Sequence, residues 1–498
     1  MMKKKLSILL ISENVPPQVN GIARRVNRYV DSLRRLGHQV TLCAPTPTPS
    51  QQQQQQEKKK KKEYGHPHEL NHDVHPSDCC WDYPNMFQQG NRFIVIKPRF
   101  LFECLFRRKY DVIHCVKPLN ISSTILIAAF RLKRFFTKES TSTPHIVVSW
   151  HCNLSEYNRM FFPKMLQKVM GLISVPFRIM VRMGDRVLVP TASTEPMLLD
   201  HLPKESIGIC ETGIEINKFN PNSKYSKEGK TWIKRRRDDL RKFKKKYILL
   251  YVGRVSPEKG LADIVRAMRK LEDECVLWIV GDGPMRSTLE SEVQKLDLPV
   301  TFWGYQTGIA LYSVYTVCDC FVSASVTETY GQTINEALAS GVQVAIPRSS
   351  GFRDAYERIL DPNTCMWTPH DDKDMVRIIR GRLGINETID RSKLITWDQA
   401  TEKLVDEYRC TRRNHDVGDV VHTILWNGQL AIAVAVLTWI AAVLQGFLIA
   451  RGMKKQSAML ISVILVLTTN GFVLSYALSC VLTVLANSRS GGGWFALF

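Results

Sequence analysis

The chain has 498 residues and is too long for one hydrophobic core. Its 28 Gly and 23 Pro are ordinary numbers for a globular protein and exclude the fibrous and disordered classes. Its 13 cysteines have no repeated spacing, which excludes a disulfide scaffold and a paired-cysteine zinc module and predicts reduced thiols. The formal charge of +21 lies in separate basic runs without interleaved aromatic residues, so it favours a membrane surface over nucleic acid as a partner.

The first half of the chain alternates between strand and helix patterns. A strand at 6–11 leads through a loop to Gly21, a helix follows at 22–36, and a second strand follows at 40–43. Two further apolar runs, 111–115 and 146–149, predict parallel strands. His151 comes directly after the last of them, where a doubly wound sheet places its ligands.

A low-complexity insertion at 45–63 contains six Gln and a run of Lys. Such a composition cannot pack a core, so we expect a surface loop without a functional role. The histidines just after it fit no metal-ligand spacing, and we interpret them as part of the same solvated segment.

The second half begins with a buried strand at 247–252, followed by Gly253, Arg254 and a turn that opens a helix. Lys259 lies in that turn. Arg254 and Lys259 therefore place two cations beside a helix N-terminus, an arrangement that suits a diphosphate. A further strand at 276–280 runs into a Gly-Asp-Gly-Pro turn, as in a repeated βα fold.

Residues 327–341 hold two carboxylates, Glu328 and Glu336, across a turn that contains Gly331. An apolar run precedes this segment and a strand pattern follows it. Carboxylates accept hydrogen bonds from sugar hydroxyls, and the backbone N–H groups of a helix N-terminus favour phosphate. The alternative is that both glutamates are solvated surface charges, but the cations upstream favour a sugar-nucleotide site.

The motifs GRVSPEKG, IVGDGP and ETYGQTINEALASG, in that order, resemble the retaining glycosyltransferases of family 4. The resemblance covers 6–367 and includes the segments VNGIARRV, VVSWHCN, VLVPTAS and GIEINKFNP. Within that family the chain is similar to the sulfoquinovosyltransferases that make a plant-type sulfolipid and to their relatives that use GDP-mannose. The resemblance implies the α/β GT-B fold, in which two Rossmann-like domains face a cleft.

The expected domains are an N-terminal, acceptor-side domain at 1–222, a basic linker at 223–246 and a nucleotide-sugar-binding domain at 247–408. Members of the family end in a helix that crosses back to the first domain. Residues 397–408 suit that role in this chain.

The resemblance also implies roles for individual residues. The catalytic set is His151 beside the donor sugar, Glu328 on its hydroxyls, and Arg254 and Lys259 on the departing diphosphate. In the donor-binding set, Gly21 lets the first loop approach the diphosphate, and Glu336 holds the ribose. The backbone amides of 330–332 lie near the sugar or phosphate. The full set is Gly21, Gly253, Tyr330, Gly331, Gln332 and Glu336.

Two features qualify these roles. The pair Cys152-Asn153 departs from the family pattern, which puts the acceptor side in doubt. No DxD-type pair lies in a suitable loop, and preorganised positive charge can stabilise the leaving group instead. We therefore expect no metal and no cofactor.

Near the C-terminus, 430–450 and 457–488 contain no charged residue, and each is long enough to cross a bilayer. We predict a transmembrane hairpin within 425–488, with spans at about 430–450 and 457–486. Basic residues flank both ends of the first span, so charge alone does not orient it. Because such nucleotide sugars are used mainly on the cytosolic or stromal face, we expect the catalytic domains to face the cytosol. Residues 1–5 lead straight into a strand, so we see no plastid transit peptide.

Three functions follow as hypotheses. The first is an integral membrane glycosyltransferase that moves a sugar from a UDP- or GDP-linked donor to diacylglycerol or another membrane lipid. Among its possible reactions we rank sulfoquinovosyl transfer first. The second is a GDP-mannose-dependent α-mannosyltransferase. The third is an inactive GT-B scaffold tethered to a membrane.

Overall fold

The computed structural model describes residues 4–45 except 17 and 19, then 79–84, 92–116, separate positions between 123 and 134, 143–151, 181–194, 198, 202–385 and 387–410. All but the first residue of the predicted low-complexity insertion lies outside this part of the chain, as do both predicted membrane spans. Among the described residues, no helix combines the length and hydropathy needed to cross a bilayer. The hairpin therefore stays a prediction.

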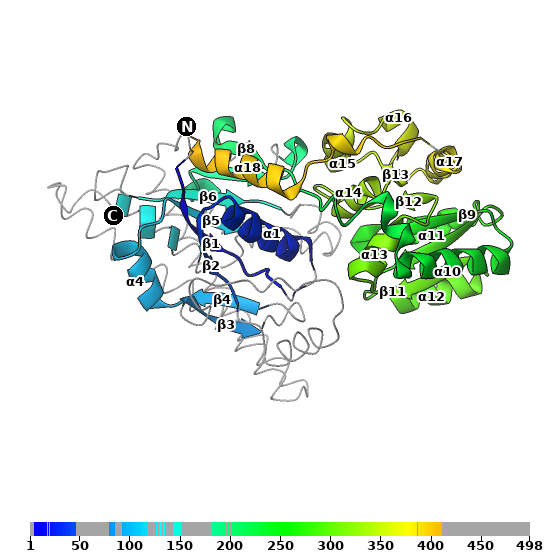
Figure 1. The fold of residues 1–498 in the computed structure, drawn as a ribbon, viewed down its shortest axis with the longest axis horizontal. Coiled ribbons are helices and arrows are strands. Elements are labelled where there is room, and N and C mark those ends of the chain that lie inside the picture. The colour runs from blue at the N-terminus through cyan, green and yellow to red at the C-terminus, as the bar shows by residue number, and fades with distance from the viewer. Residues whose placement is uncertain are drawn as a thin grey trace, which may run out of the picture.

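The N-terminal half is built on a six-stranded sheet in the order β2-β1-β5-β6-β7-β8, in which all pairings are parallel. Its strands are β1 (Ser7–Ile11), β2 (Gln39–Cys43), β5 (Val112–Val116), β6 (His145–Ser149), β7 (Arg186–Val189) and β8 (Ile207–Ile209). The runs predicted as strands at 6–11, 40–43, 111–115 and 146–149 correspond to the first four of these strands, whereas the last two were not predicted. In the described part of this half, the helices α1 (Gly21–Arg35) and α4 (Pro98–Phe106) and the antiparallel pair β3 (Cys80–Pro84) and β4 (Arg92–Ile96) accompany the sheet (Figure 1).

The C-terminal half repeats the plan, with the strand order β11-β10-β9-β12-β13-β14. The strands are β9 (Tyr247–Val252), β10 (Cys275–Val280), β11 (Val300–Gly304), β12 (Cys320–Val322), β13 (Gln343–Pro347) and β14 (Met366–Trp367). The helices are α10 (Lys227–Phe243), α11 (Leu261–Met268), α12 (Arg286–Lys295), α13 (Gly308–Tyr315), α14 (Gln332–Ala339), α15 (Ser350–Tyr356), α16 (Pro362–Cys365) and α17 (Asp372–Arg382).

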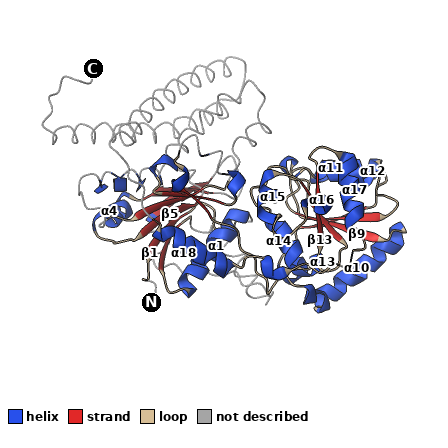
Figure 2. Ribbon diagram, turned by 90° about the horizontal axis from the view of Figure 1, so that it is seen from above, coloured by secondary structure: helices blue, strands red, loops and turns tan. Residues whose placement is uncertain are grey.

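Each sheet is buried on both faces, because alternate residues of a strand enter opposite cores. In β1, Leu9 and Ile11 pack into one cluster while Ile8 and Leu10 pack into the other. This explains why the strands appear in the sequence as continuous apolar runs rather than alternating ones. Helices cover both faces of each sheet (Figure 2). The two parallel sheets agree with the predicted pair of Rossmann-like domains.

The segment predicted as a basic linker, 223–246, is not a solvated connector. It contains α10, which packs on the C-terminal sheet through Trp232, a side chain only 1% exposed. Trp232 contacts Trp278 and Trp303, and Arg235 lies 4.5 Å and 4.7 Å above the rings of Trp232 and Trp303. The helix turns Trp232 towards the core, while Lys234, Arg237, Arg241 and Lys242 are exposed. A segment that looks like a basic linker by composition is therefore an amphipathic helix of the C-terminal half.

The predicted return helix is α18 (Trp397–Arg409), which Figure 1 shows against the N-terminal half, far along the chain from its neighbours. Trp397, Leu404 and Tyr408 are buried in the same core as β1 and α1. The two crossings between the halves run side by side, since Ile214 N–H donates to the carbonyl of Ile395 at 2.9 Å. The prediction that 397–408 crosses back is confirmed.

Acidification should loosen the docking of α18. His114 is buried between Ser149 and Tyr408, whose hydroxyl lies 2.7 Å from its Nδ1. Burial, and secondarily the charge of Arg25, lower the pKa of His114 to about 3, whereas an unfolded histidine titrates near 6.5. Between these values the unfolded state binds more protons, so stability falls as the pH drops below about 6.5.

We expect a loss of about 2 kcal/mol in the free energy of unfolding between pH 7 and pH 5 from this residue. Urea unfolding at the two pH values measures it, with His114→Gln as the control that keeps a polar group but cannot take up a proton. An equal pH slope in the wild-type protein and the variant would contradict the assignment.

Candidate active site

The sequence-predicted site residues gather where the carboxyl ends of the two sheets approach each other. From the N-terminal half, His151 follows β6 and Gly21 begins α1. From the C-terminal half, Arg254 follows β9 and Glu328 follows β12. The two sides touch here: Thr191 Oγ1 donates to the carbonyl of Thr329 at 3.1 Å, and Thr329 Oγ1 approaches the carbonyl of His151 at 3.5 Å. A doubly wound sheet places its ligands at this end of the strands.

Lys259 and Glu328 form an ion pair, in which Lys259 Nζ donates to Glu328 Oε1. Lys259 lies in a short 3₁₀ turn, Pro257–Lys259, between β9 and α11. Both side chains stay about one quarter exposed, 24% and 29%, so they are open to a ligand. The structure thus joins one predicted cation and one predicted carboxylate that are far apart in the sequence.

Arg254 is exposed, and its guanidinium makes no hydrogen bond or ion pair with any described residue. The backbone beneath it is tied down, because Tyr251 Oη donates to the carbonyl of Arg254 at 2.8 Å. Gly253 lies between them, and a Cβ added there would come within 2.8 Å of Tyr251 Oη. The turn therefore presents a free cation on a fixed backbone.

The turn before α14 depends on a left-handed glycine. Gly331 has φ of +83° and caps α14, and a Cβ there would lie 2.6 Å from the ring of Phe352. Tyr356 Oη donates to the carbonyl of Gly331 at 2.7 Å and holds the turn in place. This orients the N-terminus of α14 towards the N-terminal half.

The two residues beside Gly331 play different structural parts. The ring of Tyr330 is buried in the core, so a contact with a donor would fall to its backbone, and the role of its amide stays a prediction. Gln332 Nε2 donates across the interface to the carbonyl of Gly213 at 3.3 Å. Its Oε1 is buried without a hydrogen-bond partner in the described part of the chain.

Glu336 is not the open carboxylate that the sequence suggests. It is 1% exposed; Arg24 from α1 donates to Oε1, and Tyr315 Oη donates to Oε2 at 2.8 Å. Burial first, and then the carboxylate, raise the pKa of Tyr315 well above its usual value. The same carboxylate raises the pKa of Arg24.

Sequence reasoning missed both partners of Glu336. Arg24 lies inside the segment VNGIARRV that carries the resemblance, one turn into α1, and its side chain is 41% exposed. Tyr315 ends an apolar helix and gives no polar signal of its own. Gly21, at the start of α1, has nothing within 4 Å of an added Cβ, so its role at the donor stays a prediction.

The described residues contain no group of three or more His, Cys, Asp or Glu side chains that could hold a metal ion. The expectation of a reaction without a metal or cofactor is not tested by this and stays a prediction. Every cysteine of the described part that the structure places is a free thiol.

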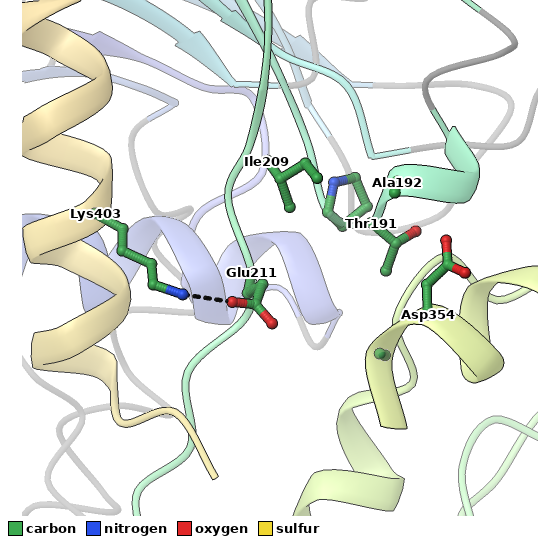
Figure 3. Close-up of a pocket in the computed structure, with 8 residues that line it drawn as sticks. Thr191, Ala192, Ile209, Glu211, Asp354 and Lys403 are labelled. Atoms are coloured by element: carbon green, nitrogen blue, oxygen red, sulfur yellow. Dashed lines mark hydrogen bonds and ion pairs between the residues drawn. The ribbon is translucent and has the colours of Figure 1, made fainter. Parts of the chain in front are cut away.

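A cavity of about 330 Å³ lies beside the contact between the halves (Figure 3). Thr191 and Asp354 face it from the two halves, and Glu211 and Lys403 form an ion pair of 2.7 Å at its edge. Arg358 of the C-terminal half also contacts Glu211, at 2.9 Å. Glu211 therefore ties the connector after β8 to α18 and to the C-terminal half.

Comparison with family models matches residues 19–218 to Glycosyltransferase Family 4 and residues 233–380 to Glycosyl transferases group 1. Among curated proteins, the chain is 27% identical over 332 residues to a sulfoquinovosyl transferase of Arabidopsis thaliana, which covers 64% of this chain and 60% of that protein. It is 28% identical over 359 residues to a GDP-mannose-dependent alpha-mannosyltransferase of Mycolicibacterium smegmatis, covering 70% and 81%. An alpha-monoglucosyldiacylglycerol synthase of Streptococcus pneumoniae is 34% identical over 168 residues, covering 32% and 36%.

Solved structures agree on the fold. The Anabaena protein HepE in complex with UDP and glucose superposes with a TM-score of 0.51 at 14% identity, covering 82% of this chain and all of that one. Sucrose-phosphate synthase from Thermosynechococcus elongatus gives 0.50 at 17% identity, covering 86% and 100%. At these identities the likeness concerns the architecture of two facing domains.

Proposed function

The chain belongs to the GT-B glycosyltransferases, with a family 4 domain ahead of a group 1 domain, and on that premise we propose that it transfers a sugar, with retention, from a nucleotide-sugar donor to a membrane lipid. The observation that carries the proposal is the ion pair between Lys259 and Glu328, together with Arg254 in the same turn after β9, whose guanidinium makes no contact with the described residues. Two cations and a carboxylate at the carboxyl ends of facing sheets suit a diphosphate joined to a polyol.

The proposed reaction depends on charge that is already in place before the donor reacts. Retaining transfer passes through an oxocarbenium-like state as the nucleoside diphosphate leaves. Arg254, as a planar fork, and Lys259, as a point charge, would stabilise the leaving oxygens without a metal. Glu328 would contact the sugar hydroxyls, and His151, directly after β6, would lie beside the donor sugar. Closure of the halves would exclude water, which otherwise competes as acceptor.

A lipid acceptor is supported by two observations. The first is the name of one bacterial relative, an alpha-monoglucosyldiacylglycerol synthase. The second observation is the surface of α4, where Phe102 and Phe106 are 50% and 67% exposed with ring centroids 4.9 Å apart. Arg107 and Lys133 lie within 6 Å of these rings, at 5.8 Å and 5.9 Å. Exposed aromatic rings among cations suit the surface of an anionic membrane.

We propose that the hairpin at 425–488 anchors the protein in a membrane, with its catalytic halves facing the cytosol. Of the candidate reactions, we rank sulfoquinovosyl transfer to diacylglycerol first. The second candidate, α-mannosyl transfer from GDP-mannose, is favoured by the mycobacterial relative, of which the matched region covers 81%. The same fold and the same charges suit either donor, because both donors carry a nucleoside diphosphate.

One experiment separates the candidates. The full-length protein in detergent is first heated with UDP, GDP or ADP, and we expect one nucleotide to raise the melting temperature by several degrees through mass action. UDP-sulfoquinovose, UDP-glucose and GDP-mannose are then offered separately with diacylglycerol and membrane extract. Product from GDP-mannose alone would move the second candidate into first place. The absence of any nucleotide shift and of any product would favour the inactive scaffold instead.

A further inference from the structure

Arg24 forms a bridge between the two halves that ends on the carboxylate proposed to hold the donor ribose. Its guanidinium comes from the second turn of α1, and Glu336 lies in the middle of α14, 312 positions further along the chain. The two partners differ sharply in exposure: the Glu336 side chain is 1% exposed, whereas the Arg24 side chain is 41% exposed. The cation thus lies over a buried anion on the side open to solvent.

Both oxygens of Glu336 already accept hydrogen bonds, one from Arg24 and one from Tyr315. Tyr315 belongs to the core of the C-terminal half and is fully buried, so it has no room to withdraw. Each oxygen could accept a second hydrogen bond, but the Glu336 side chain is 1% exposed and Arg24 lies on its open side. A ribose hydroxyl that reaches this carboxylate therefore has to take the place of Arg24. Arg24 cannot leave without a replacement, because a buried carboxylate that keeps only the hydroxyl of Tyr315 and has no counter-charge is strongly unfavourable.

The donor itself supplies a new partner for the displaced cation. Its diphosphate is attached to the same ribose, within the reach of one arginine side chain, and it carries negative charge that a planar guanidinium binds through two parallel hydrogen bonds. On the basis of the proposed function, we propose that Arg24 is a further donor-binding residue: it exchanges Glu336 for the donor diphosphate as the ribose hydroxyls occupy the carboxylate. The exchange couples donor binding to the contact between the halves.

Arg28 offers a matched control on the same helix. It lies one turn beyond Arg24 and pairs with Glu215 at 2.7 Å, with side-chain exposures of 15% and 19%. Glu215 is in the connector between the halves and is not part of the predicted donor site. Substituting Arg28 therefore removes a comparable ion pair of α1 without touching Glu336.

The test compares the affinity of the full-length protein for a nucleoside diphosphate with its affinity for the matching nucleoside, using UDP and uridine or GDP and guanosine. The nucleoside carries the ribose but no phosphate. In Arg24→Gln we expect the ratio of diphosphate to nucleoside affinity to fall about tenfold or more, since a charge-assisted contact is lost and Glu336 is left free for the ribose. Arg24→Lys should restore part of the ratio as a point charge, and Arg28→Gln should leave it unchanged.

A ratio in Arg24→Gln equal to that of the wild-type protein would overturn the inference, because a purely structural bridge affects both ligands alike. The same fall in Arg28→Gln would also overturn it. If the wild-type protein binds neither UDP nor GDP, the proposed function fails and takes this inference with it. Wild-type binding with an unchanged ratio in Arg24→Gln removes this inference alone.

Discussion

Replacing Arg254 by alanine should lower the rate of sugar transfer at least about tenfold and leave the melting temperature unchanged. The guanidinium is exposed and makes no contact with the described residues, so folding loses nothing when it is removed. In the reaction it is expected to hold the departing diphosphate through a charge-assisted contact of about 1.5–3 kcal/mol. Glu336→Ala should cost as much in transfer and also lower stability, because it leaves Arg24 and Tyr315 without their shared partner.

The matched control is Arg269→Ala, which removes an exposed arginine at the far end of α11. Steady-state transfer and thermal melting of the three variants separate the effects. Undiminished transfer in Arg254→Ala, or an equal loss in Arg269→Ala, would contradict the placement of the diphosphate.

Removing α18 should prevent the N-terminal half from folding, whereas ending the chain just after it should not. A chain that stops at residue 395 loses Trp397, Leu404, Val405 and Tyr408 from the N-terminal core. Burial of large apolar side chains contributes roughly 1.5–3 kcal/mol each, so the loss is on the order of the whole stability of a domain. We expect insoluble protein from the chain that stops at residue 395 and a folded protein from a chain that stops at Cys410.

The chain that stops at Cys410, compared with the full-length chain, also tests the predicted anchor. The chain that stops at Cys410 should wash off membranes in high salt, while the full-length chain should resist salt and carbonate, because two spans outweigh surface electrostatics. Circular dichroism and nucleotide-induced thermal shifts report whether each product is folded. A full-length protein that carbonate releases would contradict the hairpin.

Sequence patterns predicted most of the fold because each half uses parallel strands that are buried on both faces. Such strands are continuous apolar runs between turn residues, as at β1 and β9, and their ends were predicted to within about one residue. The return helix α18 was predicted from the resemblance to a family whose members end in a helix that crosses back to the first domain. The error at α10 arose because its one large buried residue, Trp232, lies among many cations.

The sequence by itself determined the kinds of residue in the site and their order along the chain: Arg254 and Lys259 after one strand, Glu328 and Glu336 around the next turn. Only the tertiary structure decided which of these groups meet. Lys259 pairs with Glu328, 69 positions away along the chain, and Arg24 pairs with Glu336, 312 positions away. Local patterns report how a segment folds and which face it buries, but an ion pair between two domains depends on how the folded halves dock, and no local pattern carries that geometry.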